Sequence, residues 1–348
     1  MIIDAHAHIV VRAATAGPGR AEAWRPRLVM AGGRERVHHD GRELTSALGE
    51  FVDPDLMAAQ AAAQGIEHLL LSPWVRLLPF DYPLDAARAI CDVQNDALAA
   101  LVAASPGRFS AVGAVALQDP PSAARDLLRA RASGLAGVEL AASVAGRYLG
   151  DDTFEPFWAA AEETGSLLFV HPTTRGLDLP VYGEYYLWNS VANPVETATT
   201  AAHLVLSGVL ERHPGLKILL AHGGGALWAL RGRLRRSYDQ VAAARSRLRE
   251  PPDVSFGKFF HDTITHDPLQ LRRLIQDAGA DHVLMGSDRP FDMGSDDPVG
   301  EVRSLGLPAA AQAAVLGGNA ARLLGLPEAA PTPAAGPQPQ RPDVSSPA

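Results

Sequence analysis

Short apolar runs alternate with longer helical stretches along most of this chain, and that alternation constrains the fold more than any other feature. The runs are rich in Leu, Ile and Val, whereas the stretches between them carry apolar residues at helical spacing and often end at Gly or Pro. The eight runs that we predict as strands are Ile2–His6, Ile66–Ser72, Phe109–Leu117, Gly137–Leu140, Leu167–His171, Lys217–His222, Phe259–Thr263 and His282–Asp288. The helical stretches include Pro54–Gly65, Tyr82–Ala104, Ser122–Gly134, Phe154–Gly165, Val195–His213 and Pro268–Ala278. Because strands that alternate with helices form parallel sheets, the pattern predicts an α/β fold, a (β/α)8 TIM barrel.

Two long segments interrupt this alternation, one after the first predicted strand and one after the fifth. Residues 11–50 hold Gly- and Arg-rich sequence, and residues 172–193 form the second excursion. Both are longer than ordinary βα loops, and both follow strand ends at which barrel enzymes build their active sites. We therefore expect them to cover a substrate, with a surface elaboration as the alternative.

The end of the chain differs in composition from the rest. From residue 327 to residue 348 the sequence is rich in Pro and Ala. Such a segment cannot bury enough apolar area to fold, so we predict a disordered C-terminal tail. The expected organisation is one barrel domain over residues 1–326, with insertions at 11–50 and 172–193, followed by that tail.

The overall composition disfavours several classes of partner. Of the 348 residues, 47% are hydrophobic and 20% are charged, which suits a soluble protein with a large core. The formal net charge of −8 disfavours nucleic acid and anionic membranes, which are bound through basic surfaces, and favours a small-molecule substrate. Cys91 is the only cysteine, which suits a reducing compartment. Since we find neither a signal-peptide pattern nor an apolar run of about 18 residues, we expect a cytoplasmic protein.

Two histidines lie two positions apart in the strand that opens the chain. His6 and His8 should therefore project from the same face of an extended segment, which in a barrel is the lumen. Imidazoles in an apolar core are costly without partners, but at the mouth of a barrel they form half of a site for a divalent metal. A His-x-His pair alone is a weak signal and is often incidental.

Three further polar residues follow apolar runs on other strands. His171, His222 and Asp288 come at the ends of the fifth, sixth and eighth predicted strands. Taken singly, each has an ordinary structural interpretation, such as a histidine bound by a carbonyl group or an aspartate that caps a helix. Because the carboxyl ends of barrel strands converge on one mouth, the joint arrangement predicts a metal site.

The residues around these positions form motifs that resemble those of a known family. The motifs are Asp4-Ala5-His6-Ala7-His8, Val170-His171-Pro172, His222-Gly223-Gly224-Gly225 and Gly286-Ser287-Asp288-Arg289-Pro290-Phe291. In this order they resemble the amidohydrolase superfamily, in its amidohydrolase-2 branch typified by 2-amino-3-carboxymuconate-6-semialdehyde decarboxylase. The resemblance covers roughly residues 1–325.

The resemblance implies a role for each of the five polar residues. His6, His8, His171 and Asp288 would bind the metal, zinc or, as an alternative, manganese, and His222 would act as the acid/base residue. Asp288 would share the proton handling. A mixed nitrogen and oxygen ligand set with an open position independently suits zinc.

A single metal ion is expected rather than two. Superfamily members with two metals use a carboxylated lysine at the end of the fourth strand. Here that strand is Gly137–Leu140, and the only lysines of the chain, Lys217 and Lys258, lie elsewhere.

The residues on the substrate side depart from the family pattern. Arg42 is the nearest candidate for the family's arginine ahead of the Asp-Pro step, which anchors a substrate carboxylate, but its spacing is shifted. The family's His171-Pro172 motif is often followed by tryptophan, whereas here Thr173-Thr174-Arg175 follows. Arg289 replaces a residue that is usually tyrosine. We expect Arg42, Arg175, Arg289 and Trp188 to bind an acidic, planar substrate. The alternatives are solvated or ion-paired arginines and a tryptophan that packs under a loop.

These features predict a metal-dependent, non-oxidative decarboxylase of an unsaturated or aromatic carboxylic acid, a carboxy-lyase. Decarboxylation requires stabilisation of the developing carbanion and then its protonation, and a metal site beside an imidazole provides both. The alternative is a hydrolase or hydratase that acts on an amide, a lactone or a double bond at the same mononuclear site. A non-catalytic barrel is the third interpretation. The resemblance also implies a homodimer.

Overall fold

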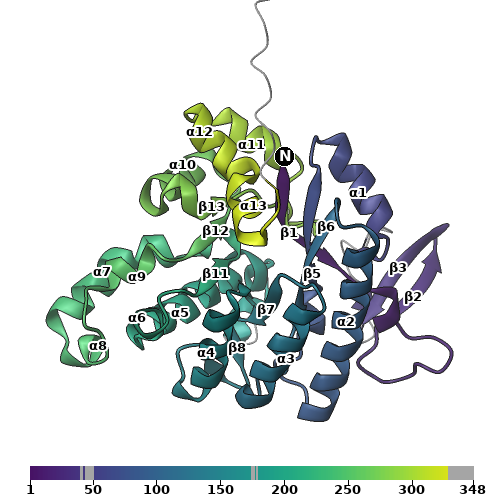
Figure 1. Ribbon diagram of the computed structural model, residues 1–348, viewed down its shortest axis with the longest axis horizontal. Helices are drawn as coiled ribbons and strands as arrows, with labels where there is room; N and C mark the ends of the chain where they lie inside the picture. The colour runs from purple at the N-terminus through teal and green to yellow at the C-terminus, as the bar shows by residue number, and fades with distance from the viewer. Residues whose placement is uncertain (40–41, 44–50, 174–176, 178, 328–348) are drawn as a thin grey trace, which may run out of the picture.

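The computed structural model describes residues 1–39, 42–43, 51–173, 177 and 179–327. Its main element is a sheet of 8 parallel strands that is surrounded by helices (Figure 1). In sheet order the strands are β1 (Ile3–Ile9), β5 (His68–Pro73), β6 (Phe109–Ala114), β7 (Gly137–Ala141), β10 (Leu167–His171), β11 (Lys217–Leu220), β12 (Phe260–Asp262) and β13 (Val283–Leu284). The Ala5 N–H donates to the Met285 carbonyl oxygen at 2.8 Å, and Asp288 N–H to that of His6 at 2.8 Å. These bonds join the last strand to the first, so the predicted barrel is confirmed.

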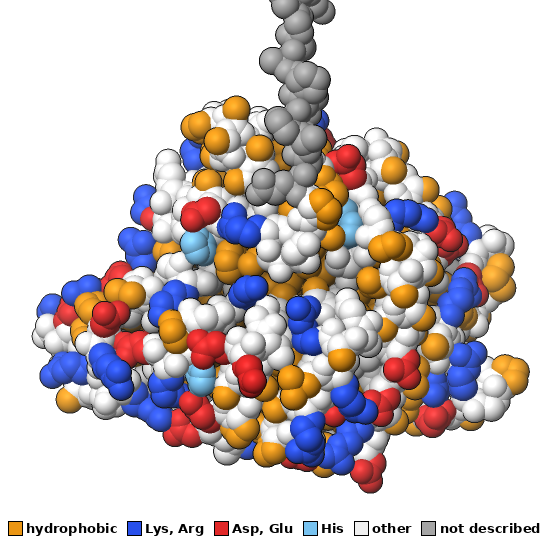
Figure 2. Space-filling view, in the orientation of Figure 1, with side chains coloured by type: hydrophobic (Ala, Val, Ile, Leu, Met, Phe, Trp, Pro, Cys, Tyr) orange, Lys and Arg blue, Asp and Glu red, His pale blue; other side chains and the backbone are white. Residues whose placement is uncertain are grey.

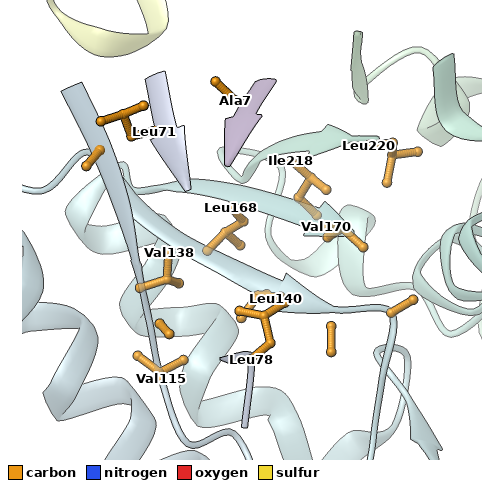
Figure 3. Close-up of a cluster of buried hydrophobic side chains, with 14 of the residues drawn as sticks. Ala7, Leu71, Leu78, Val115, Val138, Leu140, Leu168, Val170, Ile218 and Leu220 are labelled. Carbon is orange, nitrogen blue, oxygen red and sulfur yellow. The ribbon is translucent and has the colours of Figure 1, made fainter. Parts of the chain in front are cut away.

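Two apolar clusters follow the alternation of side chains along these strands. Leu168, Val170, Ile218 and Leu220 belong to the larger cluster, which joins the strands to the helices (Figure 3). The smaller cluster fills the lumen with residues from several strands, among them Ile3, Leu70, Phe169, Leu219 and Leu284. Because both faces of the strands are buried, the strands read as continuous apolar runs in the sequence.

A bulge in β1 decides where the two N-terminal histidines point. Asp4 pairs with Leu69 and Ala7 pairs with Leu71, so β1 contains one residue more than β5 between these pairs. The extra residue changes the face that following side chains occupy. Ile3 therefore faces the lumen at an odd position, whereas His6 and His8 face it at even positions.

The helices are regular, with one correction to the prediction. Their bounds are α1 (Pro54–Ala63), α2 (Leu84–Ala104), α3 (Pro120–Ala132), α4 (Glu155–Thr164), α5 (Asn193–Leu206), α6 (Val209–Arg212), α7 (Leu227–Gln240), α8 (Ala242–Arg245), α9 (Pro252–Phe256), α10 (Pro268–Ala278), α11 (Pro298–Ser304), α12 (Ala309–Ala313) and α13 (Asn319–Leu324). Short 3-10 turns are Arg12–Ala14, Val75–Leu77, Asp152–Phe154, Pro180–Gly183, His222–Gly224 and Ala280–His282, and π-turns are Trp188–Ala192 and Ala314–Gly318. The single helix predicted over Val195–His213 was wrong, because Gly208 adopts a left-handed φ of 76° and separates α5 from α6.

The first insertion contains a small antiparallel sheet beside the barrel. It consists of β2 (Arg27–Ala31), β3 (Arg34–His39) and β4 (Arg42–Glu43), and β2 and β3 project from one side of the molecule (Figure 1). A second short pair, β8 (Ser143–Val144) and β9 (Arg147–Tyr148), follows β7. That the insertions cover a substrate stays a prediction, and residues 328–348 of the predicted tail lie outside the described residues.

The surface carries charges of both signs. Figure 2 shows basic and acidic side chains interspersed on the face in view. Among the described residues, no helix combines the length and the apolar character that a membrane span requires.

Candidate metal centre

Four buried side chains from three parts of the chain converge at the carboxyl end of the barrel. His6, His8, His171 and Asp288 each place one ligand atom within 4.8 Å of the others. His6 Nε2 lies 2.9 Å from His8 Nε2, and both lie 3.3 Å from Asp288 Oδ1. The structure thus brings together all four residues that the sequence predicted as metal ligands.

The hydrogen bonds of the three rings decide which nitrogen faces the centre. Each Nδ1 has an acceptor in the surrounding protein, so the proton belongs on Nδ1 and the lone pair on Nε2. The acceptors are Asp262 Oδ2 at 2.7 Å from His6, the Pro73 carbonyl oxygen at 3.1 Å from His8 and the Pro172 carbonyl oxygen at 2.8 Å from His171. Three imidazole lone pairs therefore point at one place beside a carboxylate.

This arrangement fits a divalent cation. Among the described residues, His171 Nε2 and Asp288 Oδ1 are buried without a hydrogen-bond partner. Buried polar atoms without a partner cost stability. Three nitrogens and one oxygen form the ligand set of a mononuclear zinc-type site, and a cation would satisfy these atoms together.

The pKa values describe the same electrostatic preference. Burial lowers the pKa of His6, but Asp288 and Asp262 outweigh burial and raise it to about 10. Burial opposes ionisation of Asp288, yet the charge of His6 and the hydrogen bond with His222 hold its pKa well below the usual range. Burial holds the pKa of His171 well below its ordinary value. The carboxylates of Asp288 and Asp262 thus favour a positive charge at the centre, which a proton on His6 or a metal ion can provide.

His222 lies beside this cluster, in the turn that follows β11. Its Nε2 is 3.4 Å from Asp288 Oδ2, and its ring centroid is 5.0 Å from that of His171. Its backbone has a left-handed φ of 56°, and the three glycines that follow also have positive φ. The predicted strand end was two residues too long here, because β11 ends at Leu220.

A cavity of about 760 Å³ opens onto the same end of the barrel. His222 and Asp288 contribute to its wall, together with apolar side chains from α7, α10 and the neighbouring loops. Asn189 and Ser190 of the second insertion also line it. The polar centre therefore faces a space in which a small organic molecule can lie.

The family follows from a comparison with known sequences. A family model described as amidohydrolase matches residues 3–326. This chain belongs to the amidohydrolase family.

Two relatives of this amidohydrolase with curated functions, and one similar solved structure, are decarboxylases. It is 28% identical over 294 residues to 2-amino-3-carboxymuconate-6-semialdehyde decarboxylase of Dictyostelium discoideum, covering 82% of this chain and 80% of the relative. It is 31% identical over 247 residues to gamma-resorcylate decarboxylase of Rhodococcus jostii, covering 65% of this chain and 74% of the relative. Among solved structures, 5-carboxyvanillate decarboxylase of Sphingomonas paucimobilis superposes with a TM-score of 0.79 at 26% identity, covering 94% of this chain and 99% of that chain.

Of the four residues predicted to bind substrate in this amidohydrolase, the structure describes the side chains of Arg289 and Trp188. Arg289 donates from Nε to Asp4 Oδ2 at 3.1 Å and from Nη2 to Gln64 Oε1 at 2.6 Å, so its guanidinium is held by the protein. Trp188 is 39% exposed and contacts the Tyr186 ring edge to face. Arg175 and the side chain of Arg42 lie outside the described residues. Their roles in substrate binding stay predictions.

Asp262 belongs to the site although it was not among the residues predicted from the sequence. It ends β12 and is fully buried in the lumen, where it accepts hydrogen bonds from His6 and from the backbone of the His222 turn. Its position at a strand end is the signal that identified the other site residues. That signal was available within the predicted strand Phe259–Thr263.

Proposed function

We propose that this amidohydrolase is a metal-dependent, non-oxidative decarboxylase of an unsaturated or aromatic carboxylic acid. In this proposal His6, His8, His171 and Asp288 hold one divalent metal ion and His222 transfers the proton. The observation that carries the proposal is the convergence of three imidazole lone pairs and a buried carboxylate beside a histidine at the wall of a cavity. The decarboxylase function of the relatives supports it.

The reaction needs two things from the site. Loss of carbon dioxide leaves an electron pair on carbon, and that carbon must then receive a proton. When bound, the ion supplies positive charge that stabilises the negative charge developing on the substrate. We assign the proton transfer to His222, because it lines the cavity, its Nε2 lies 3.4 Å from Asp288 Oδ2 and its side chain is 17% exposed. Asp288 stabilises the protonated ring, and contact with solvent allows His222 to regain its proton.

The side chains that line the cavity indicate which shape of substrate fits it. Trp228, Ile264, Leu274 and Met293 provide apolar surface, which suits the face of a planar ring. Apolar walls also exclude water, which strengthens the electrostatic interactions of the centre with an acidic group. An aromatic carboxylic acid therefore matches the cavity better than an extended polar substrate does.

Finer features are part of the same proposal. We propose zinc as the ion, because three imidazoles and one carboxylate suit it, with manganese as the alternative. A homodimer and a cytoplasmic location are proposed from the family resemblance and from the single cysteine.

Metal analysis coupled to a substrate screen tests the function. The purified full chain is analysed for metal and incubated with gamma-resorcylate, 5-carboxyvanillate and related hydroxybenzoates, and both carbon dioxide and the aromatic product are measured. We expect one metal ion per chain, equal amounts of the two products and loss of turnover with a chelator that added metal reverses. In D2O the product should carry one deuterium at the carbon that lost the carboxylate.

Two results would contradict the proposal. A folded protein with full turnover and no metal would exclude the metal site. Water addition without carbon dioxide release, tested with amides, lactones and unsaturated acids, would favour the hydrolase or hydratase alternative.

A further inference from the structure

A single buried carboxylate contacts two different parts of the proposed site. Asp262 has no exposed surface and lies at the end of β12. It accepts four hydrogen bonds, from His6 Nδ1 at 2.7 Å, His222 N at 2.8 Å, Gly223 N at 2.7 Å and Ile264 N at 3.0 Å. A carboxylate offers about four acceptor positions, so its hydrogen-bonding capacity is fully used.

The two oxygens divide these donors in an informative way. Oδ2 accepts both the ring N–H of His6, a proposed metal ligand, and the backbone N–H of His222, the proposed proton donor. Oδ1 accepts from the backbone N–H groups of Gly223, in the His222 turn, and of Ile264, which follows β12. One oxygen atom therefore links a proposed metal ligand with the residue proposed to transfer the proton.

The backbone of the His222 turn requires such support. His222 and Gly223 have φ values of 56° and 61°, and the left-handed region is costly for a residue with a side chain. Consecutive left-handed residues direct their N–H groups to the same side, where a carboxylate can bind both. Asp262 occupies that position.

The neighbouring residue supports the same turn from the other face of β12. A Cβ atom at Gly224 would lie 2.6 Å from Nδ1 of His261, so the ring packs directly against the turn. His261 also accepts from Trp228 Nε1 at 3.3 Å, and Trp228 lines the cavity. β12 thus contacts the turn through Asp262 from the lumen and through His261 from outside.

We propose that Asp262 is a positioning residue that sets two properties of the site at once. It fixes the tautomer of His6, so that Nε2 presents its lone pair to the metal, and it fixes the backbone from which the His222 side chain reaches the substrate. The inference rests on the proposed function. It adds that metal affinity and proton transfer depend on the same carboxylate.

The variant Asp262→Asn tests this coupling because it keeps the size of the side chain. The amide has one acceptor oxygen, and its NH2 group would face N–H donors. We expect the Kd for Zn2+, measured on the metal-free protein by competition with a chelator, to rise by about 10- to 100-fold. At saturating Zn2+ we expect kcat to fall by at least about 10-fold while KM changes little, as for an interaction that matters in the transition state. The Nδ1 proton of His6, followed by 15N imidazole NMR, should lose the signature of its bond to a carboxylate.

A matched control separates these effects from a general loss of stability. Asp267 is another aspartate near the end of β12, and it accepts hydrogen bonds from the N–H groups of Leu269 and Gln270 at the start of α10. Asp267→Asn should lower thermal stability slightly and leave Kd, kcat and the His6 signal unchanged. If Asp262→Asn does not fold, Asp262→Glu, which keeps the charge but moves it by one methylene group, is measured in the same way and should show both losses.

The outcomes are distinct. The inference is wrong if the Asp262 variant keeps its Zn2+ affinity or its kcat within about twofold of the wild type, because the proposal requires both to fall. An unchanged His6 Nδ1 signal would also overturn it. If the wild type itself neither binds Zn2+ nor releases carbon dioxide, the proposed function fails, and the NMR comparison still decides whether Asp262 fixes the tautomer of His6.

Discussion

The two ends of the barrel lumen are lined by different kinds of side chain. The lower part holds Ile3, Phe169, Leu219 and Leu284, which pack as a closed apolar cluster. The mouth holds three histidines and buried carboxylates, and several of their polar atoms have no hydrogen-bond partner among the described residues. The difference separates two tasks, because apolar burial stabilises the fold, whereas buried polar groups cost stability and provide chemistry.

The backbone shows the same division. His222 and Asp288 at the mouth both have left-handed φ values, 56° and 58°, whereas none of the lower-lumen residues Ile3, Phe169, Leu219 and Leu284 has a positive φ. Strained conformations of this kind persist where the surroundings determine them, which is common at functional sites. The comparison predicts that substitutions at the mouth change function with little effect on stability, and that substitutions below it do the reverse.

The largest effect is expected at His222. His222→Ala removes the proposed proton donor, so turnover of an accepted substrate should fall by about 100- to 10,000-fold. Metal content and melting temperature should stay near wild type, since within the described part of the chain the ring makes one long hydrogen bond. Turnover and metal content of the purified variant are the measurements. His203→Ala, at an exposed histidine stacked on Tyr148 away from the cluster, is the control. Full turnover by His222→Ala would show that another group delivers the proton.

A substitution in the lower lumen should have the opposite profile. Leu167 is 1% exposed at the start of β10, and Leu167→Ala should lower the free energy of unfolding by about 2–5 kcal/mol through lost burial and a cavity. Urea unfolding of the metal-free protein measures this loss. The folded variant should bind the metal as the wild type does. Leu128→Ala, at a leucine that is 47% exposed on α3, should change the same free energy by less than about 0.5 kcal/mol. A loss of metal affinity in Leu167→Ala would contradict the proposal that the lower lumen stabilises the fold while the mouth carries the function.

The same comparison explains what the sequence could predict. The barrel and the five polar residues of the mouth were predictable because apolar runs mark parallel strands and because strand ends converge. Each of these signals is local. His171 and its strand Leu167–His171 were even predicted with the observed bounds.

Features that depend on contacts between distant segments were not predictable. The bulge in β1, which turns His6 and His8 to the lumen, depends on pairing with β5. The ion pair of Arg289 with Asp4 joins residues 285 positions apart, so the sequence alone does not indicate it. Asp262 lies in a strand of 3 residues. Its hydrogen-bond donors include His6 of β1 and His222 after β11, which are far from it in the sequence. A short strand shows too little periodicity to indicate which face a residue occupies.

The smallest expected effect concerns Glu139, a carboxyl group on the boundary between the two regions. Glu139 is 1% exposed in the middle of β7, and neither of its oxygens has a hydrogen-bond partner among the described residues. Burial raises its pKa well above the ordinary value of 4.5, whereas Asp262, with four donors, has a lowered pKa. The donors, rather than depth alone, decide which buried carboxyl group carries charge.

A raised pKa gives this carboxyl group a defined effect on stability. Below pH about 4.5 both the folded and the unfolded forms are protonated, so the native environment carries no ionisation penalty. As pH rises from there toward the folded pKa, the unfolded form ionises while the folded form stays neutral, and the wild type loses stability. Glu139→Gln, which cannot ionise, should therefore gain stability relative to the wild type between pH 5 and pH 8. The gain should be larger at pH 8 than at pH 5, because the unfolded carboxyl group is ionised more fully at pH 8 while burial keeps the folded one neutral. Urea unfolding of the two metal-free proteins at both pH values measures the gain. An equal difference in stability at pH 5 and pH 8 would mean that Glu139 is ionised in the folded protein and that a partner for its charge exists at the mouth.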